Sequence, residues 1–467
     1  MTASDKQDLL RKLPAIDSLL AGELVAPMLA DHPRSVVVRC LREAVDVVRG
    51  RVLGGTATTC LVDEIISIAG CKLASLSRPS IRRAINATGV ILHTGLGRAV
   101  WPREVMRGVG ADLEGYVTLA IDPETGARSE RYLRVEHILT ELTGAEAAAV
   151  VNNNAAATLL ALSAMAGGKE AIVSRGQLIE IGGSFRLPDV MSQSGAKLVE
   201  VGTTNRTHLK DYRSAITDQT AIIMRVHPSN YRIMGFTSQP GLDELVALAH
   251  EHNMPLLDDL GAGALVNLED LPTPLPHEPT VQESIAAGAD VVLFSADKLI
   301  GASQGGVIVG RKRYIEAIRN HPLYRALRPD KMCLMVLERT LHLFRDPKRL
   351  LREHPLYSML TATPEALEQR ANELSAAISA KLPHVQPRVR KAVGYTGSGS
   401  LPMEQLPTFV VAIAPTTISA GELARRLRLD DACVFTRIEG GCVLMDVRTL
   451  FDGDSPVIAQ ALARVLA

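Results

Sequence analysis

The sequence contains a series of short apolar runs that each end in Gly, Asn, Asp or Ser, and no other feature limits the possible folds as strongly. The runs occupy residues 147–154, 171–176, 221–229, 254–261, 290–295 and 305–310. Unbroken aliphatic runs suit strands that are buried on both faces, and the segments between them suit crossover helices. The pattern predicts an α/β fold with a mostly parallel sheet and helices on both sides. Ligands of such sheets bind beyond the carboxyl ends of the strands, where the polar residues fall.

The pattern changes twice along the chain, which predicts three domains. Residues 1–75 show helical periodicity without strand alternation and predict a small helical module. Residues 76–355 carry the apolar runs and form the predicted large domain. Residues 356–467 combine a long helical stretch, the Gly/Ser-rich loop 394–402 and alternating strands and helices, which predicts a smaller α+β domain.

Charge and composition exclude a broad nucleic-acid-binding surface. The 467 residues include 51 Lys+Arg and 51 Asp+Glu, so a nucleic-acid partner must meet a local patch. The aromatic residues are 1 Trp, 8 Tyr and 7 Phe, too few for a protein that reads single strands mainly by stacking. Residues 1–80 carry 10 Lys+Arg and 9 Asp+Glu, so charge does not say what the helical module contacts.

The cysteines and the N-terminus predict a cytoplasmic protein. No pair of cysteines has zinc-ligand spacing, which predicts a reduced chain without a structural metal. The N-terminus is charged and lacks the apolar core of a secretory signal, and no run of about 18 apolar residues predicts a membrane span. The cysteines are Cys40, Cys60, Cys71, Cys333, Cys433 and Cys442.

The most informative segment for chemistry is Ser295–Lys298, directly after the run 290–295. A serine three residues before a lysine at a strand end resembles the S-x-x-K signature of pyridoxal-phosphate enzymes with the aspartate aminotransferase fold. In that signature the lysine bonds to the cofactor and the serine contacts its phosphate. The chemistry requires an amine held where burial and nearby cations lower its pKa. Lys298 is therefore the predicted cofactor lysine.

Two further runs supply groups that such a cofactor needs. Asp259, at the end of the run 254–261, offers a carboxylate that would keep a pyridinium nitrogen protonated. Asp258 competes for this role, and either aspartate could instead cap a helix.

A phosphate site is predicted where the run 147–154 leads into a helix. The N–H groups at this helix start could hold a phosphate with the help of the helix dipole, and a simple capped helix start is the alternative. The residues concerned are Asn153, Asn154, Ala155 and Ala156.

Longer motifs carry a resemblance to one family. They are RRAINATGVILHTGLGRA, VVNNNAAA, SRGQLIEIGGSFRLPDVM, VGTTNRTHLKDY, HPSNYRIMGF, DLGAGAL, FSADKLIGASQGG, HPLYRALRPDKM and RIEGGCVLMDVRTL. The set resembles bacterial selenocysteine synthase, the L-seryl-tRNA(Sec) selenium transferase, over roughly residues 8–467. Two positions depart from the expected motifs, because Ala262 stands where a serine is expected and Gln177 stands where a glutamate is expected.

The resemblance implies a pyridoxal 5'-phosphate enzyme that converts seryl-tRNA(Sec) to selenocysteinyl-tRNA(Sec). Water would leave the seryl group by β-elimination to give an aminoacrylyl intermediate, and selenium from selenophosphate would then add. The resemblance also implies a homodecamer built as a pentamer of dimers. In this family the N-terminal helical module binds the D-arm of the tRNA, which gives residues 1–75 a predicted role.

The predicted donor site is rich in arginine, because a trianionic donor requires fixed cations and arginine binds oxyanions through two N–H groups. The resemblance assigns selenophosphate binding to Arg98, Arg325 and Arg328. The stretch 311–353 has 12 Lys+Arg and 5 Asp+Glu, so a solvated face or a tRNA backbone site is the alternative for the last two. Asp297, beside the lysine, is predicted to orient a proton-transfer group.

The remaining candidates are weaker. Arg175 or Gln177 is predicted to stack on the cofactor ring. The other candidates lie in or near the motifs. The histidines near motifs are predicted to be structural, the threonines an interface segment, and the cysteines buried apolar groups. These residues are His93, His208, His227, Thr203, Thr204, Cys333 and Cys442.

Two other functions fit parts of the sequence. A pyridoxal-phosphate lyase acting on a free amino acid would use the same lysine, aspartate and phosphate segment. A non-enzymatic tRNA-binding scaffold on an enzyme fold would keep the N-terminal module but not the cofactor. The module argues against the first alternative, because a lyase for free amino acids needs no tRNA contact.

Overall fold

The computed structural model describes residues 3–56, 61–77, 79–183, 185–402 and 404–466. Cys60, one of the cysteines considered above, lies outside them. The chain forms two compact units, Met1–Arg83 and Ala84–Ala467. The predicted boundary near residue 355 does not separate two compact units, and the division into three domains stays a prediction.

The first unit is helical. Its apolar core is built mainly by the two long helices α4 and α5, with Leu41, Val48 and Ile65 fully buried between them. α2 ends at Leu20, and turns lead from it into α3. The helices are α1 (Ala3–Arg11), α2 (Ile16–Leu20), α3 (Ala26–Asp31), α4 (Arg34–Gly54) and α5 (Leu61–Ser77).

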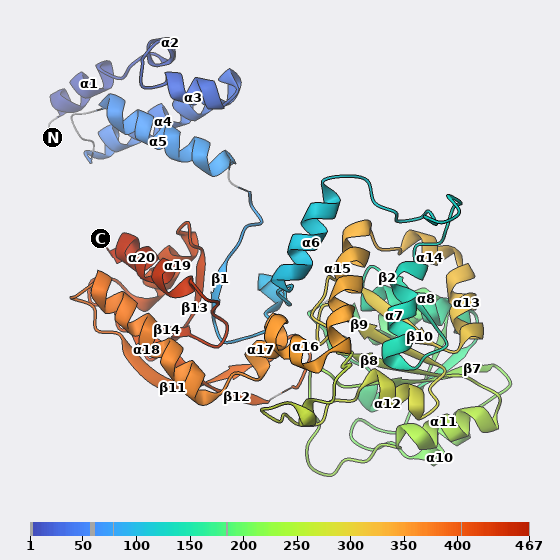
Figure 1. The fold of residues 1–467 in the computed structure, drawn as a ribbon. Helices are drawn as coiled ribbons and strands as arrows, with labels where there is room; N and C mark the ends of the chain where they lie inside the picture. Colours follow the sequence, from blue (N-terminus) through green and yellow to red (C-terminus); the bar gives the residue numbers. More distant parts are fainter. Residues whose placement is uncertain (1–2, 57–60, 78, 184, 403, 467) are drawn as a thin grey trace. The chain divides into compact units, whose positions relative to one another are not determined.

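The second unit contains a seven-stranded sheet with the order β2-β10-β9-β8-β7-β3-β6, drawn in Figure 1. β10 is antiparallel to both neighbours, and the other described pairings in this sheet are parallel. The predicted mostly parallel α/β sheet is therefore confirmed. The strands are β2 (Ala147–Val151), β3 (Glu170–Ser174), β6 (Lys197–Val201), β7 (Thr220–Val226), β8 (Leu256–Gly261), β9 (Val291–Ser295) and β10 (Gly306–Gly310).

Both faces of this sheet are buried, which explains the unbroken apolar runs. Along β2, Ala147 and Ala149 pack into one core cluster, and Ala148 and Val150 pack into the other. Helix α8 (Asn154–Ala166) contributes to the first cluster and contacts β9 and β10, whereas α7 (Leu133–Thr143) contributes to the second (Figure 1).

Further helices surround the sheet and connect it to the C-terminal part. They are α6 (Arg103–Leu113), α9 (Leu187–Ser194), α10 (Leu209–Ala215), α11 (Leu242–Glu251), α12 (Val281–Ala286), α13 (Lys312–Asn320), α14 (Pro322–Ala326), α15 (Lys331–Leu341), α16 (Pro347–Glu353) and α17 (Pro355–Leu360). A short hairpin of β4 (Glu180–Ile181) and β5 (Phe185–Arg186) lies outside the large sheet.

The C-terminal part has its own five-stranded sheet, with the order β1-β13-β14-β12-β11. β1 comes from the start of the unit and pairs in parallel with β13, which the sequence pattern did not predict. The elements are β1 (Ile85–Ala87), α18 (Pro364–Lys381), β11 (Arg388–Tyr395), β12 (Gln405–Ile413), α19 (Ala420–Leu429), β13 (Val434–Glu439), β14 (Cys442–Asp446) and α20 (Asp454–Leu466).

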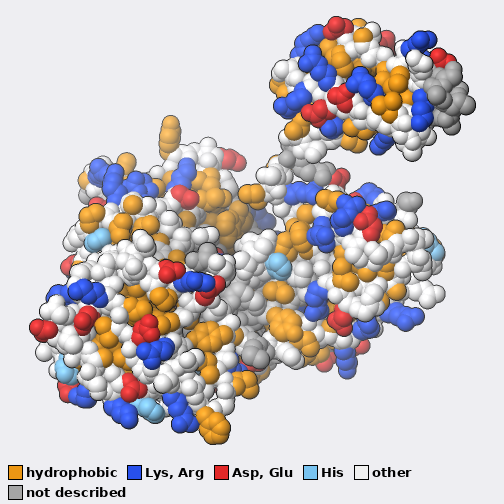
Figure 2. All heavy atoms as spheres, turned by 180° about the vertical axis from the view of Figure 1, so that it is seen from behind, with side chains coloured by type: hydrophobic (Ala, Val, Ile, Leu, Met, Phe, Trp, Pro, Cys, Tyr) orange, Lys and Arg blue, Asp and Glu red, His pale blue; other side chains and the backbone are white. Residues whose placement is uncertain are grey.

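Charged side chains of both signs are intermixed on the face shown in Figure 2, in line with the net charge of zero. Among the helices that the structure describes, none combines the length and the apolar character needed to cross a membrane.

A buried aromatic group supports the turn that follows β9. The Nε2 of His354 lies 2.9 Å from the carbonyl oxygen of Ile300, and the Tyr357 hydroxyl donates to the carbonyl of Leu299 at 2.9 Å. Both rings are fully buried and pack edge-to-face with Phe344. Burial lowers the pKa of His354 to about 4, so the ring is neutral in the folded protein near pH 7.

This buried histidine predicts a specific acid sensitivity. In the unfolded chain His354 binds a proton below its ordinary pKa of 6.5, whereas in the folded chain it binds one only as the pH approaches 4. The contribution of His354 to the free energy of unfolding should therefore fall by about 3 kcal/mol between pH 7 and pH 4. Denaturant titrations of the wild type and His354→Gln across this range measure it. A stability difference between the two that does not change with pH contradicts the prediction, and His137→Gln, at an exposed position, is the control.

Candidate active site

The candidate site lies beyond the carboxyl ends of the central strands β8 and β9. Lys298 follows β9 by three residues and is only 5% exposed. Two glycines with left-handed backbone bring the main chain close to its amine. A methyl group on Gly261 would lie 3.8 Å from Lys298 Nζ, and one on Gly399 would lie 3.5 Å from it. The Gly/Ser-rich loop predicted from the sequence therefore reaches the lysine.

The environment of Lys298 favours its neutral form. Burial lowers the pKa of the amine, and the positive charge of Arg98 lowers it further, against the opposing carboxylates of Asp259, Asp297 and Glu278. A neutral amine can act as a nucleophile or accept a proton, whereas an ammonium group can do neither. The lysine therefore has the electrostatic setting that its predicted role requires.

Asp259, near the end of β8, is a second buried group whose charge acts on Lys298. Its carboxylate accepts hydrogen bonds from Asn154 Nδ2 at 2.9 Å, from Thr158 Oγ1 at 3.0 Å and from the N–H of Gly261 at 3.1 Å. Burial raises the pKa of Asp259, while these donors and Lys298 oppose the rise. The carboxylate is therefore buried and held by three hydrogen bonds, and a cationic group bound beside it would be strongly stabilised.

Asp258 occupies the opposite face of β8. It forms an ion pair with Arg225 of β7, with N–O distances of 2.9 and 3.0 Å, and accepts a hydrogen bond from Ser284 Oγ at 2.7 Å. Successive side chains of a strand point to opposite faces, so the two aspartates cannot share one role. Asp258 serves the packing of β7 and α12, and the geometry favours Asp259 as the site carboxylate.

The predicted phosphate segment forms the start of α8. Asn153 caps the helix by accepting a hydrogen bond from the N–H of Ala156 at 2.9 Å, so this N–H is already used. The N–H groups of Asn154 and Ala155 lie in the first helical turn and have no acceptor within the helix. Ala155, together with Asn153 and Ala156, lines a cavity of about 480 Å3. Of the four predicted N–H groups, that of Ala156 is therefore occupied by the helix cap.

Ser295 and Asp297 complete the turn around the lysine. Ser295 is the last residue of β9, pairs with Gly306 of β10 and is 5% exposed. Asp297 accepts a hydrogen bond from Arg98 Nη1 at 2.7 Å. Arg98 has a left-handed backbone with φ of 62° and follows Gly97 at 90°, so the tight turn aims its side chain at Asp297. The sequence motif thus places a cation directly beside the lysine turn.

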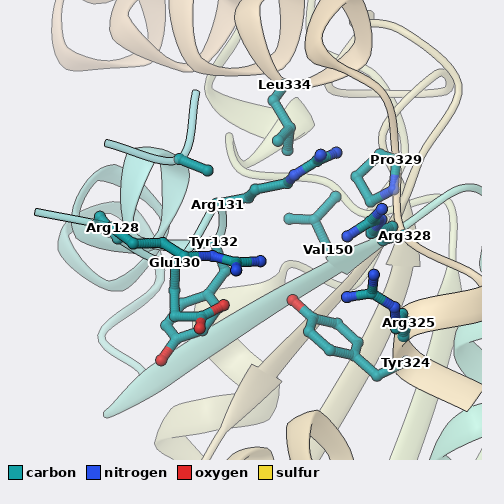
Figure 3. A pocket seen from close by; sticks show the side chains of 12 residues that line it. Arg128, Glu130, Arg131, Tyr132, Val150, Tyr324, Arg325, Arg328, Pro329 and Leu334 are labelled. Carbon is teal, nitrogen blue, oxygen red and sulfur yellow. The ribbon is translucent and has the colours of Figure 1, made fainter. Parts of the chain in front are cut away.

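Arg325 and Arg328 lie in a different pocket, shown in Figure 3. Arg131 of the segment before α7 also lines this pocket, which has a volume of about 180 Å3. Arg98 is not among the residues that line this pocket. The assignment of all three arginines to one donor site stays a prediction.

Other predicted site residues have local partners. Arg175 pairs with Glu200 at 3.0 Å, and the Oε1 of Gln177 accepts from the N–H of Val226 at 3.0 Å. A stacking role for either side chain stays a prediction. Thr203 closes a turn with Arg206. The remaining candidates are placed as follows: Thr204 is exposed, His208 begins α10, His93 has an unpartnered buried Nδ1, Cys333 is buried and Cys442 is half-buried.

Several residues near the lysine carry no motif that predicted them. Ser229 is 1% exposed, its hydroxyl has no hydrogen-bond partner among the described residues, and a methyl group on Gly399 would lie 3.3 Å from that hydroxyl. Glu278 is buried and lies 3.5 Å from His227 Nε2. Tertiary folding brings these residues together, and only the polar ending of the run 221–229 signalled Ser229 in advance.

Comparisons with known proteins identify the family. The family model for L-seryl-tRNA selenium transferase matches residues 84–451, and a model for the selenocysteine synthase N terminus matches residues 10–49. The chain belongs to the L-seryl-tRNA selenium transferase family. An L-seryl-tRNA(Sec) selenium transferase of Caldanaerobacter subterraneus subsp. tengcongensis is 46% identical over 98% of this chain and 99% of that protein. One of Geobacter sulfurreducens is 45% identical over 97% and 98%. The resemblance seen in the motifs is confirmed.

Solved structures support the fold. A structure of D-glucosaminate-6-phosphate ammonia-lyase superposes with a TM-score of 0.57 at 20% identity and covers 84% of this chain and 97% of that one. This similarity concerns the fold alone. The expected aspartate aminotransferase-like architecture of this selenium transferase family member is confirmed.

The two aspartates of β8 give opposite predictions for a conservative change. Asp258→Asn leaves Arg225 partly uncompensated and should lower the free energy of unfolding by about 3 kcal/mol. Asp259→Asn removes a carboxylate that burial disfavours and should change stability much less, while turnover falls at least about 100-fold. Denaturant titration and activity measurements on both variants test this. Loss of turnover in Asp258→Asn with unchanged stability would reverse the assignment.

Proposed function

We propose that this protein converts L-seryl-tRNA(Sec) to L-selenocysteinyl-tRNA(Sec), with pyridoxal 5'-phosphate as cofactor and selenophosphate as selenium donor. The observation that carries the proposal is a buried amine, Lys298, beside a buried carboxylate, Asp259, in a chain of the selenium transferase family. The names of the relatives supply the substrate, and the residues of this site supply the chemistry.

The residues at the site fit pyridoxal phosphate. Lys298 offers an amine whose pKa is lowered by burial, Asp259 offers a hydrogen-bonded carboxylate for a ring nitrogen, and the first turn of α8 offers N–H groups for a phosphate. The unpartnered buried atoms Asn154 Oδ1 and Ser229 Oγ are further polar groups that a bound cofactor would satisfy. When bound, this cofactor supplies an electron sink for the charge that develops at the α-carbon of an amino acid.

The proton transfers fall to Lys298 and its neighbours. Its Nζ is the group that would take the α-proton of the seryl ester, because burial and the charge of Arg98 lower the pKa of this amine. The same nitrogen, once protonated, could pass the proton to the departing β-hydroxyl group, which would leave as water. The contact between Arg98 and Asp297 would keep the turn and its lysine oriented during both transfers.

Donor binding falls to the arginines. Guanidinium groups at Arg325 and Arg328 suit the phosphate oxygens of selenophosphate, and Arg98 supplies a cation at the lysine turn.

We further propose that Met1–Arg83 binds the tRNA and that the chain assembles as a homodecamer, a pentamer of dimers. The N-terminal family match over residues 10–49 supports the first of these. Free thiols at Cys40 and Cys71 fit a reducing compartment, and we propose the cytoplasm.

The assay with seryl-tRNA(Sec) and selenophosphate tests the proposal. The full-length holoenzyme should produce selenocysteinyl-tRNA(Sec), and Lys298→Ala should lose at least about three orders of magnitude in rate, because the variant lacks the amine proposed to move the α-proton. Arg107→Ala, on the exposed surface of α6, serves as the control and should retain full activity. Product formation from free serine, with none from seryl-tRNA(Sec), would instead establish a lyase for free amino acids.

A further inference from the structure

The pocket beside β2 holds more arginines than the sequence motifs suggested. One wall is the segment 128–132 and the other runs from the end of α14 to Pro329. Val150 and Leu334 provide apolar surface between the walls. Figure 3 shows Arg131 reaching across the pocket toward Arg328 and Pro329. Arg128, Arg131, Arg325 and Arg328 therefore gather around a space of about 180 Å3.

These arginines lack the acidic partners that neighbouring arginines have. Arg319 pairs with Glu136 and Arg339 pairs with Asp112. In contrast, no ion pair among the described residues involves any of the four pocket arginines, although Glu130 also lines the pocket. The side chains of Arg128, Arg325 and Arg328 are exposed and that of Arg131 is half-buried.

The four guanidinium groups repel one another. The pKa of Arg328 is lowered, first by the charge of Arg131 and then by partial desolvation, Arg325 and Arg128. Unpaired like charges held at short range are unfavourable unless a ligand of opposite charge joins them. An anion bound among the four arginines would therefore relieve this repulsion.

The shape and the polar groups of the pocket restrict the kind of ligand that can bind there. Arginines on two facing walls can each offer a pair of N–H groups to a tetrahedral oxyanion. Burial raises the pKa of Tyr324 to about 12, so its hydroxyl stays protonated and can donate to the same anion. A volume of about 180 Å3 is large enough for one phosphate-sized group.

We propose that Arg128 and Arg131 act together with Arg325 and Arg328 as a binding site for one small phosphate-type oxyanion. The inference rests on the proposed function for its physiological ligand, the phosphate group of selenophosphate. It adds the segment 128–132 to the donor site and makes Arg131, whose side chain reaches from one wall toward the other, its central contact.

Phosphate titration of the full-length holoenzyme tests the site without relying on turnover. Inorganic phosphate is the probe, and calorimetry and the shift in melting temperature are the readouts. Arg131→Gln should weaken phosphate binding about tenfold and reduce the stabilisation by phosphate. The variant without phosphate should be at least as stable as the wild type, because one repelling charge is gone. Arg107→Gln also removes one positive charge, but outside the pocket, and should bind phosphate as the wild type does.

Kinetics with the two substrates separate the possible sources of the anion. The KM for selenophosphate should rise about tenfold in Arg131→Gln, while the KM for seryl-tRNA(Sec) stays within twofold. An unchanged phosphate affinity in Arg131→Gln, or no phosphate binding by the wild type, overturns the inference. A rise in the KM for seryl-tRNA(Sec) alone also overturns it, since the pocket would then hold a tRNA phosphate. Failure of the proposed function would appear separately, as absence of selenium transfer by a wild type that still binds phosphate here.

Discussion

The burial of one amine beside one carboxylate is the interaction on which the site depends. An ammonium group at the position of Lys298 would be costly to desolvate, so the folded protein favours the neutral amine. Asp259 is held by donors from α8 and from its own strand, which fix it on the face of the sheet that points to α8. The parallel strands bring both groups to one edge, and left-handed glycines let the backbone close over them.

Much of this architecture follows from the sequence. The apolar runs predicted β2, β3 and β7 to β10 because strands buried on both faces have unbroken aliphatic stretches. β6 and β11 lie at sheet edges with several exposed positions, and β1 pairs with a strand far along the chain, so local pattern gave no signal for them.

The site was predictable only where one motif contains its residues. The motif alone predicted Lys298. The choice between Asp258 and Asp259 required knowing which face of β8 each side chain occupies. The close approach of Ser229 and Gly399 depends on the tertiary fold and could not be predicted. The basic stretch 311–353 shows the same limit, because it contains both Arg339, which is paired with Asp112, and the unpaired arginines of the pocket. Composition records the surplus of charge, and only the structure separates structural ion pairs from groups available to a ligand.

The most direct test of this account is to identify the residue that bonds to the cofactor. Purified protein loaded with pyridoxal 5'-phosphate is reduced with borohydride, digested and analysed by mass spectrometry. The account predicts a pyridoxyl modification on the peptide that contains Lys298, and none on that peptide in Lys298→Ala. Modification of a different lysine, or an unmodified Lys298 in the loaded wild type, would contradict it.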